Sequence, residues 1–358
     1  MGSSFTLTGK VIAEATGAPL PYSTVTIEQI GRERFTDATG TFTYFAVPPG
    51  KYRIRIRQLG YTPFDSTLQL NATNADPVFA LVRIPSTLAD VEVKAPVRRC
   101  IVPEENGYVD DTDLTTVLGE ARKNAEREGL LRRTYPFEYK LAQAHDTYDL
   151  RDSTHHIVYD TITFRSDDIW KYRKGKVVSP DRSKIFGEVR VMRLPTLTDL
   201  ADQRFLLAHC FKYSGIYDDD GVPEHRIDFA PLPEIIAPDV EGSIFMDSAT
   251  YLIKRAEFRL TKGGSIKPPV LGMSVTTTYR KILPNVALFD EIRSVQPLPA
   301  ASAADHLTEF RQTQRLLSFR FLYGGPPGSD SALMRKSPVT GLQSSPPPSA
   351  PKGPGQEH

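Results

Sequence analysis

Stretches in which apolar and polar residues alternate follow one another over residues 5–83. The clearest covers residues 51–59, where Tyr52, Ile54 and Ile56 fall on one side and arginines on the other. Side chains of a strand point alternately to its two faces, so this pattern predicts a strand with one buried face. About seven such strands, separated by turn sequences rich in Gly, Pro, Thr and Asp, predict a small β-sandwich.

In one place, residues 112–129, the apolar spacing is that of an amphipathic helix. Asp111, Thr112 or Asp113 would cap its start, and Gly129 would end it. The predicted apolar face consists of Leu114, Val117, Leu118, Ala121 and Ala125.

After this helix, eleven stretches of mostly alternating residues predict strands. Many long strands with one helix predict a mainly β protein, in which a large curved antiparallel sheet, or half-barrel, wraps around the helix or is capped by it. The predicted strands are residues 134–143, 155–165, 168–178, 186–193, 204–214, 224–231, 242–247, 251–262, 270–283, 286–296 and 306–322.

Length and composition favour two folded domains. The chain has 358 residues, of which 40% are hydrophobic and 24% charged, close to ordinary globular values. We expect the sandwich over residues 5–83, a linker over residues 84–110, and the helix with the half-barrel over residues 111–323. Residues 324–358 are rich in Pro, Ser and Gly, so we expect a disordered tail that cannot bury enough apolar surface to fold.

Charge and hydropathy exclude some classes of protein. The formal net charge of +1 gives no overall field toward nucleic acid, so we expect no nucleic-acid partner. No apolar run approaches the roughly 18–20 residues needed to cross a bilayer, so we expect no transmembrane segment. The chain starts without an apolar signal segment. Two alternatives follow: the protein is cytosolic, or it is exported and its signal peptide is absent from this chain.

The chain has two cysteines, Cys100 and Cys210. Two thiols are too few for a four-ligand structural zinc site unless His or carboxylate groups complete it. In an oxidising compartment they would form one disulfide between the linker and the second domain. We favour this disulfide, with two buried and inert thiols as the alternative.

Four spaced motifs resemble the carboxypeptidase regulatory-like domain. They are GKVIAEATGAPLPYSTV, TDATGTFTY, VPPGKYRIRI and GY, all within residues 5–83. The resemblance implies a transthyretin-like (prealbumin-like) sandwich, a structural or adhesive module without catalytic activity. In that family the domain often precedes another, including outer-membrane receptors and barrels of some bacteria.

The motifs also give single residues a physical role. Gly17 and Gly40 fit tight turns that need a positive φ, which glycine adopts without steric cost. Phe42, Tyr44 and Tyr52 are expected to fill the core of the sandwich.

The hairpin sequence DVEGSIFMD of residues 239–247, followed by YLIKRAEF of residues 251–258, resembles the hairpin of lipoprotein-carrier (LolA/LolB-like) half-barrels. The regulatory-like domain belongs mostly to exported proteins of bacterial envelopes. The resemblance therefore favours export, with a periplasmic or outer-membrane-associated location, over the cytosolic alternative.

Two sets of residues are candidate binding sites. The first is a set of aromatic residues in the second domain, which together with Phe137 would line a concave pocket for an acyl chain or would instead pack as core. Basic residues on one strand of the sandwich would bind anionic glycans or lipid headgroups, or would form a solvated face. The aromatic set is Tyr139, Tyr159, Phe164, Trp170 and Tyr172, and the basic stripe is Lys51, Arg53, Arg55 and Arg57.

The sequence contains no convincing catalytic set, and we expect no metal and no cofactor. His306 and Glu309 have the spacing of zinc carboxypeptidase ligands, but residues three apart on a strand face opposite sides. We therefore expect a non-catalytic envelope protein. Its sandwich would dock an envelope or outer-membrane partner, and its half-barrel would hold a lipid or another hydrophobic or extended ligand. The alternatives are a hydrolase with an unrecognised site on the second domain and a purely structural surface or adhesion protein.

Overall fold

The computed structural model describes most of the two predicted domains. Much of the expected linker, nearly all of the expected tail, and His306 lie outside the described residues. The described residues are 4–70, 76–85, 100–104, 111–149, 152–167, 170–183, 187–266, 269–270, 272–298, 308–327 and 329.

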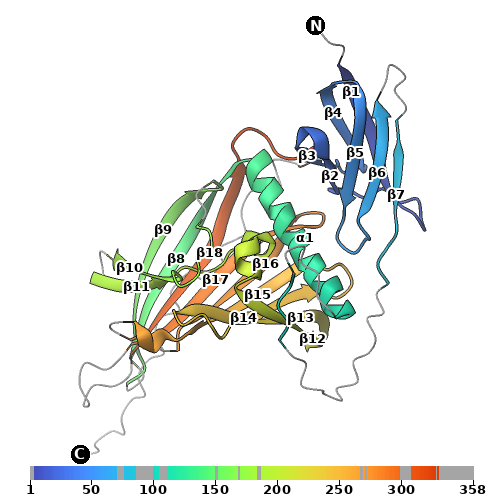
Figure 1. The fold of residues 1–358 in the computed structure, drawn as a ribbon. Coiled ribbons are helices and arrows are strands. Elements are labelled where there is room, and N and C mark those ends of the chain that lie inside the picture. The colour runs from blue at the N-terminus through green and yellow to red at the C-terminus, as the bar shows by residue number, and fades with distance from the viewer. Residues whose placement is uncertain are drawn as a thin grey trace, which may run out of the picture.

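Two small sheets form the N-terminal sandwich (Figure 1). One has the strand order β4-β1-β7 and the other the order β3-β2-β5-β6. Only the pair β1–β7 is parallel among the pairs described in these two sheets. The strands are β1 (Phe5–Ala13), β2 (Thr24–Ile27), β3 (Arg32–Phe35), β4 (Thr41–Val47), β5 (Gly50–Arg57), β6 (Phe64–Leu70) and β7 (Val78–Leu81).

The core of the sandwich confirms the roles predicted from the motifs. Phe42, Tyr44 and Tyr52 expose 2%, 1% and 6% of their surface and belong to one apolar cluster between the sheets. Gly17 and Gly40 have φ values of 66° and 76°. Both therefore occupy the left-handed region that favours glycine.

The second part of the chain is dominated by one nine-stranded antiparallel sheet that curves around a long helix, as predicted (Figure 1). Its strand order is β12-β13-β14-β15-β16-β17-β18-β8-β9, so the last strand of the sheet pairs with its first in sequence. The strands are β8 (Phe137–Asp149), β9 (Thr154–Arg165), β12 (His209–Asp219), β13 (Val222–Pro231), β14 (Asp239–Asp247), β15 (Ile253–Thr261), β16 (Ser274–Leu283), β17 (Val286–Leu298) and β18 (Thr308–Phe321).

Helix α1 (Thr112–Thr134) packs its predicted apolar face on the concave side of this sheet. The five residues of that face expose at most 1% of their surface, and the Asp111 carboxylate caps the helix by accepting from the Leu114 N–H at 2.9 Å. The prediction that Gly129 ends the helix is wrong. Leu130 and Leu131 are fully buried, and their packing carries the helix on to Thr134.

Two predicted strands differ from the structure. Residues 170–177 form turns and extended chain, and the strand begins only at β10 (Val178–Ser183), which pairs with β11 (Gly187–Met192) as a separate hairpin. Residues 204–206 belong to the short helix α2 (Gln203–Leu206), which follows the 3-10 helix η2 (Leu197–Ala201). Asp202 starts α2 by accepting from the Arg204 N–H at 2.9 Å, and this local cap overrides the alternation in the sequence.

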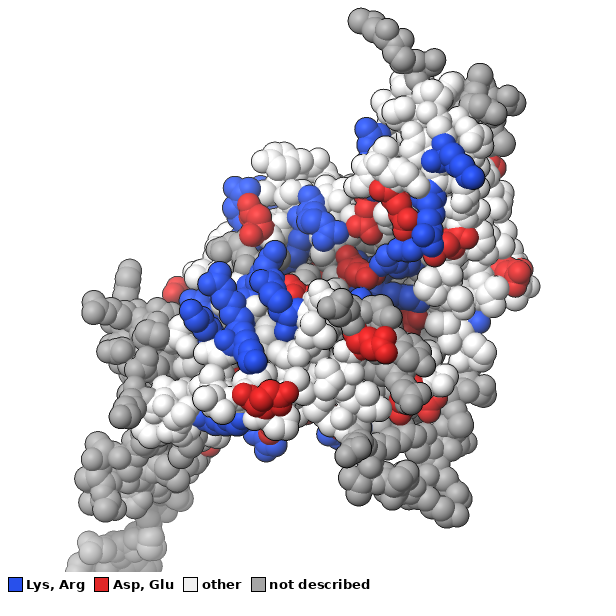
Figure 2. Space-filling model, in the orientation of Figure 1, with Lys and Arg blue, Asp and Glu red and all other residues white. Residues whose placement is uncertain are grey.

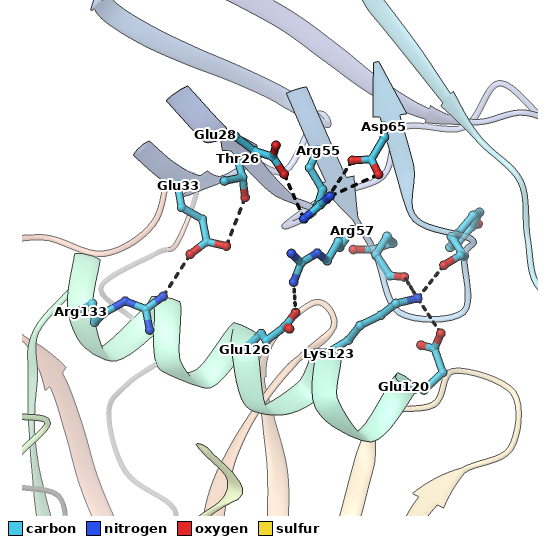
Figure 3. A network of polar contacts seen from close by, with 12 residues as sticks. Thr26, Glu28, Glu33, Arg55, Arg57, Asp65, Glu120, Lys123, Glu126 and Arg133 are labelled. Carbon is cyan, nitrogen blue, oxygen red and sulfur yellow. Dashed lines mark hydrogen bonds and ion pairs between the residues drawn. The ribbon is translucent and has the colours of Figure 1, made fainter. Parts of the chain in front are cut away.

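The opposite side of α1 joins the sandwich through buried polar groups (Figure 3). The ammonium group of Lys123 donates to the backbone carbonyl of Tyr61 at 2.6 Å and to the Glu120 carboxylate at 2.6 Å. Glu120 also accepts from the backbone N–H of Gly60 at 2.9 Å. Arg127 donates to the Gln58 side chain at 3.1 Å. These contacts fix α1 between the sandwich and the large sheet.

A disulfide joins Cys100 to Cys210 at the start of β12, with a Cα–Cα distance of 5.2 Å. Beside it, Ile101 and Phe211 exchange backbone hydrogen bonds of 2.9 and 2.7 Å. The segment that precedes α1 is thereby fastened to one edge of the sheet.

No helix within the described ranges is both long enough and apolar enough to cross a membrane.

Candidate ligand-binding cavity

A cavity of about 220 Å³ lies between the C-terminal half of α1 and the concave face of the sheet. The first half of α1 packs closely against strands β12–β16, so the apolar core fills the concave face there. Toward the other end the sheet leaves this space, which the segment Leu194–Leu197 covers from the side.

Aromatic side chains form much of the cavity wall. Tyr139 on β8 and Phe164 on β9 are direct neighbours in register, and their rings stack at a centroid distance of 5.5 Å. Phe289 on β17 meets Tyr139 edge to face at 5.3 Å. Trp170 and Tyr279 complete this set. Three of the five aromatic residues singled out in the sequence therefore line one cavity: Tyr139, Phe164 and Trp170.

The other two lie elsewhere. Tyr172 is a core residue, 1% exposed, whose hydroxyl donates to the Asp239 carboxylate at 2.7 Å. Tyr159 lies five positions before Phe164 on β9, so its side chain is on the opposite face, where it is 52% exposed. Phe137 is fully buried in the core beside the cavity.

Helix α1 contributes a buried ion pair to the cavity. One carboxylate oxygen of Glu128, Oε1, accepts from Arg132 Nε at 2.8 Å and lies 2.6 Å from Arg132 Nη2. The guanidinium also donates to the backbone carbonyl of Ser166 at 3.3 Å and lies over the Phe137 ring at 5.4 Å. The side chains of Glu128 and Arg132 expose 3% and 7% of their surface. The cavity is therefore apolar with one strongly polar end.

Tyr279 on β16 also lines the cavity. Burial raises the pKa of its hydroxyl far above the ordinary value, and the negative charge of Glu128 raises it further. The hydroxyl is therefore protonated at any physiological pH. Thr277 and Gln314 add polar side chains to the same wall.

Sequence analysis did not find the Glu128–Arg132 pair. Glu and Arg four residues apart on a helix are typical of a solvated surface, where such pairs contribute a few tenths of a kcal/mol. In this chain the pair is buried because the segment Leu194–Leu197 and the sheet enclose the end of α1.

Arg55 and Arg57 of the basic stripe lie on the side of the sandwich toward α1, and acidic groups match them (Figure 3). Arg55 pairs with Glu28 at 3.0 Å and with Asp65 at 2.8 Å, and its hydrogen bond to Asp65 lowers the pKa of that carboxyl. Arg53 pairs with the same two carboxylates, and Arg57 pairs with Glu126 of α1. Lys51 is exposed. Most of the stripe thus serves contacts within the chain.

A second hollow, of about 450 Å³, lies on the outer face of strands β13–β16. Its charged groups compensate one another: Arg226 donates to Asp228 at 2.7 Å, and Arg259 donates to Glu241 at 2.9 Å. None of these four charged side chains is therefore left unpaired for a ligand in this hollow.

Several exposed cations lie close in sequence to Trp170 and Leu194 of the cavity wall. Figure 2 shows Lys and Arg side chains gathered on the face of the molecule that carries α1. The exposed cations next to Trp170 and Leu194 in sequence are Lys171, Arg173, Lys174, Lys176 and Arg193.

Within the described part of the chain, no group of three or more His, Cys, Asp or Glu residues is placed to hold a metal ion.

Comparison with known proteins identifies the first domain. Residues 6–82 match the carboxypeptidase regulatory-like domain family, as the motifs predicted, and this part of the chain is such a domain. A search of curated proteins found no match to the chain.

Three solved structures resemble the second part distantly. One is a DUF1329 family protein from Desulfovibrio piger, with 10% identity, a TM-score of 0.30, and coverage of 58% of this chain and 94% of that one. Another is a putative outer membrane lipoprotein-sorting protein domain from Vibrio parahaemolyticus, with 12% identity, a TM-score of 0.26, and coverage of 57% and 94%. The third is a LolA superfamily protein from Nitrosomonas europaea, with 10% identity, a TM-score of 0.25, and coverage of 56% and 92%. At this level of similarity nothing about ligands follows for this chain.

Proposed function

We propose that this chain is a non-catalytic binding protein of the bacterial cell envelope. Its curved sheet and α1 hold one small hydrophobic ligand, and its sandwich docks an envelope or outer-membrane partner. The observation that carries the proposal is the aromatic-lined cavity beneath the C-terminal half of α1. Ligand sites in proteins are mostly apolar hollows with a few placed polar groups, and this cavity has that composition.

The size of the cavity limits the ligand. Pockets for drug-sized molecules measure about 300–1,000 Å³, and this cavity measures about 220 Å³. It accommodates one short chain or one ring. A ligand with several long acyl chains would need α1 to move away from the sheet.

The sandwich supports a docking role because one of its sheets, β4-β1-β7, carries exposed apolar residues. Phe45 on β4 is 64% exposed and Val78 on β7 is 60% exposed. The other sheet supplies Arg57, which pairs with α1. The sandwich therefore holds the helix with one sheet and presents the other to a partner.

Native mass spectrometry tests the binding function. The full chain is purified from its own cell envelope and measured with and without mild organic extraction. We expect a small extra mass that extraction removes. A bare polypeptide mass in both preparations, together with no response of the protein to any short-chain or single-ring probe, would exclude the ligand-binding function.

A second measurement localises the ligand. Trp170 is the only tryptophan of the chain and lines the cavity. Its fluorescence should therefore change when extracted protein is titrated with a short apolar probe. Binding without any such change would place the ligand outside this cavity.

A further inference from the structure

Part of the cavity wall carries polar side chains that the fold leaves without hydrogen bonds. They are the hydroxyls of Tyr279 and Thr277, the amide of Gln314 and the indole N–H of Trp170. None of these groups has a hydrogen-bond partner among the described residues, and none is one of the unpartnered polar atoms that the protein encloses completely. Their polar atoms therefore keep accessible surface, on residues that line the cavity. A partly enclosed polar group gains free energy from a hydrogen bond to whatever occupies the space beside it.

Strand pairing gathers these groups on one part of the wall. Thr277 of β16 lies opposite Ile292 of β17, and Ile292 lies opposite Gln314 of β18. Paired residues of neighbouring strands share a face of the sheet, so Thr277 and Gln314 flank Ile292 on the concave face. Tyr279 lies further along β16 and pairs with Phe289, one of the aromatic residues of the wall. Tyr279 is therefore the polar residue that adjoins the aromatic surface.

Other polar residues of the wall are already engaged. Glu128 and Arg132 bind each other through Oε1 of Glu128, and the second oxygen of Glu128 is fully buried, out of reach of a ligand. The Thr196 hydroxyl donates to the Asp199 carboxylate at 3.1 Å, and Tyr139 has contacts of its own. An ionised ligand is disfavoured, because the cation of the wall, Arg132, already has its counter-charge.

The free groups are mainly donors. Hydroxyls, an amide NH₂ and an indole N–H all donate, and only the side-chain carbonyl of Gln314 accepts without also donating. Burial and the negative charge of Glu128 raise the pKa of Tyr279 far above its ordinary value, so its hydroxyl keeps the proton that it donates. An uncharged acceptor oxygen on an apolar body therefore matches both the polar patch and the aromatic wall.

We propose that the cavity takes an uncharged ring or short apolar chain that carries a carbonyl oxygen, as a ketone, an ester or a lactone does, and that this oxygen accepts a hydrogen bond from the hydroxyl of Tyr279. Thr277 and Gln314 supply further donors on the same wall. This inference rests on the ligand-binding function proposed above and specifies the chemical class of the ligand.

Two probes of nearly the same shape test the inference. Cyclohexanone and methylenecyclohexane differ in that a C=O group replaces a C=CH₂ group, so only the ketone has an acceptor oxygen. Each is titrated into the extracted, isotope-labelled full chain. Binding is followed by the nuclear magnetic resonance signal of the Trp170 indole N–H, which is unique because the chain has one tryptophan.

The variant Tyr279→Phe removes the hydroxyl and keeps the ring. It deprives no described residue of a hydrogen bond, so it should fold like the unmodified chain. Because a hydrogen bond between uncharged groups is of moderate strength, we expect the ketone to bind about fivefold more weakly and the alkene to change by less than about twofold. Tyr159→Phe, at an exposed position on the opposite face of β9, is the matched control and should change neither affinity.

The outcomes separate the two proposals. Binding of the alkene without binding of the ketone, or a ketone affinity that Tyr279→Phe leaves unchanged, would overturn the carbonyl inference and leave the binding function standing. Equal weakening of both probes by Tyr279→Phe would also overturn the inference, since the hydroxyl would then act only through the shape of the cavity. If neither probe shifts the signal of Trp170, both the inference and the cavity as a binding site fall.

Discussion

The backbone N–H of Gly60 in the sandwich donates a 2.9 Å hydrogen bond to the carboxylate of Glu120 on α1. This contact belongs to a buried polar set on one side of α1, while Glu128 and Arg132 of the same helix line the cavity on another side. A single rigid helix is therefore held by the regulatory-like domain and also covers the proposed ligand. A shift of α1 would therefore change both its contact with the sandwich and the shape of the cavity.

The first prediction concerns the buried charges at this contact. Lys123 is paired with Glu120, and burial lowers the pKa of Lys123 and raises that of Glu120. Lys123→Met would leave the Glu120 carboxylate buried and unpaired, so we expect a loss of about 3–5 kcal/mol in the free energy of unfolding. Equilibrium unfolding in urea measures this.

Two further variants control this experiment. The double variant Glu120→Gln/Lys123→Met should recover part of the loss, because it removes the unpaired carboxylate but also takes from the buried Arg127 the compensating charge of Glu120. The exposed Lys140, changed to Met, should shift stability by no more than about 0.5 kcal/mol. Strictly additive losses for Glu120→Gln and Lys123→Met would contradict the pairing.

The second prediction concerns the cavity. Thr277 points into it from β16 and is 6% exposed, so Thr277→Phe should fill the space. We expect short apolar probes to bind at least about tenfold more weakly, a change of about 1.4 kcal/mol, as read from the fluorescence of Trp170. The neighbouring variant Thr278→Phe places the same ring on the other face of β16 and should leave binding unchanged. Equal effects of both variants would argue against the cavity.

The third prediction compares two glycines of the sandwich. A Cβ at Gly40 would lie 2.6 Å from the Val11 carbonyl oxygen, whereas a Cβ at Gly17 would have nothing within 4 Å. Both positions have a positive φ, which alone costs about 1–2 kcal/mol for alanine. Gly17→Ala should therefore lower the free energy of unfolding by about that amount and Gly40→Ala by roughly twice as much or more. Thermal unfolding of the two variants tests the ranking, which equal losses would refute.

The fourth prediction concerns acid stability. His225 is 1% exposed and stacks on Tyr251 at 4.9 Å, and burial lowers its pKa below the ordinary value of 6.5. Below about pH 6.5 the unfolded chain binds a proton that the folded chain does not, so the stability contributed by this group falls as the pH drops toward the folded-state pKa. The slope reaches at most about 1.4 kcal/mol per pH unit.

Urea unfolding at several pH values between about 7 and 5 checks this prediction, because histidine ordinarily titrates in this range. His225→Gln should show a shallower decline than the unmodified chain. The comparison isolates His225 from His145, whose pKa burial also lowers. Identical slopes would mean that His225 does not take up a proton on unfolding.

Periodicity in the sequence correctly predicted the buried face of those elements in which the spacing of the apolar residues alone defines that face. The apolar face of α1 and the core of the sandwich were correctly predicted because both follow from spacing. The helix end at Gly129 was not, because Leu130 and Leu131 gain their burial from tertiary packing, against β8 next in sequence and against strands of the sandwich and the sheet that lie far away in sequence. Tertiary packing there outweighs the local preference of glycine.

The candidate site shows the same limit. Tyr139 and Phe164 meet because β8 and β9 pair in a register that alternation alone does not specify. Tyr172 was placed in a strand that does not form at that position. The second face of α1, with Glu120 and Lys123, looks like a solvated surface until the sandwich covers it.

Strand β18 lies between β17 and β8 in the sheet and is the last strand of the chain that the structure describes. Its residue Gln314 lies on the cavity wall between residues of β8 and β17. During synthesis, domains near the N-terminus generally fold first. The sandwich can therefore fold while the ribosome is still translating, but the cavity acquires its full wall only after residue 321 has emerged. A chain that stops before β18 would keep the sandwich but lack one wall of the cavity.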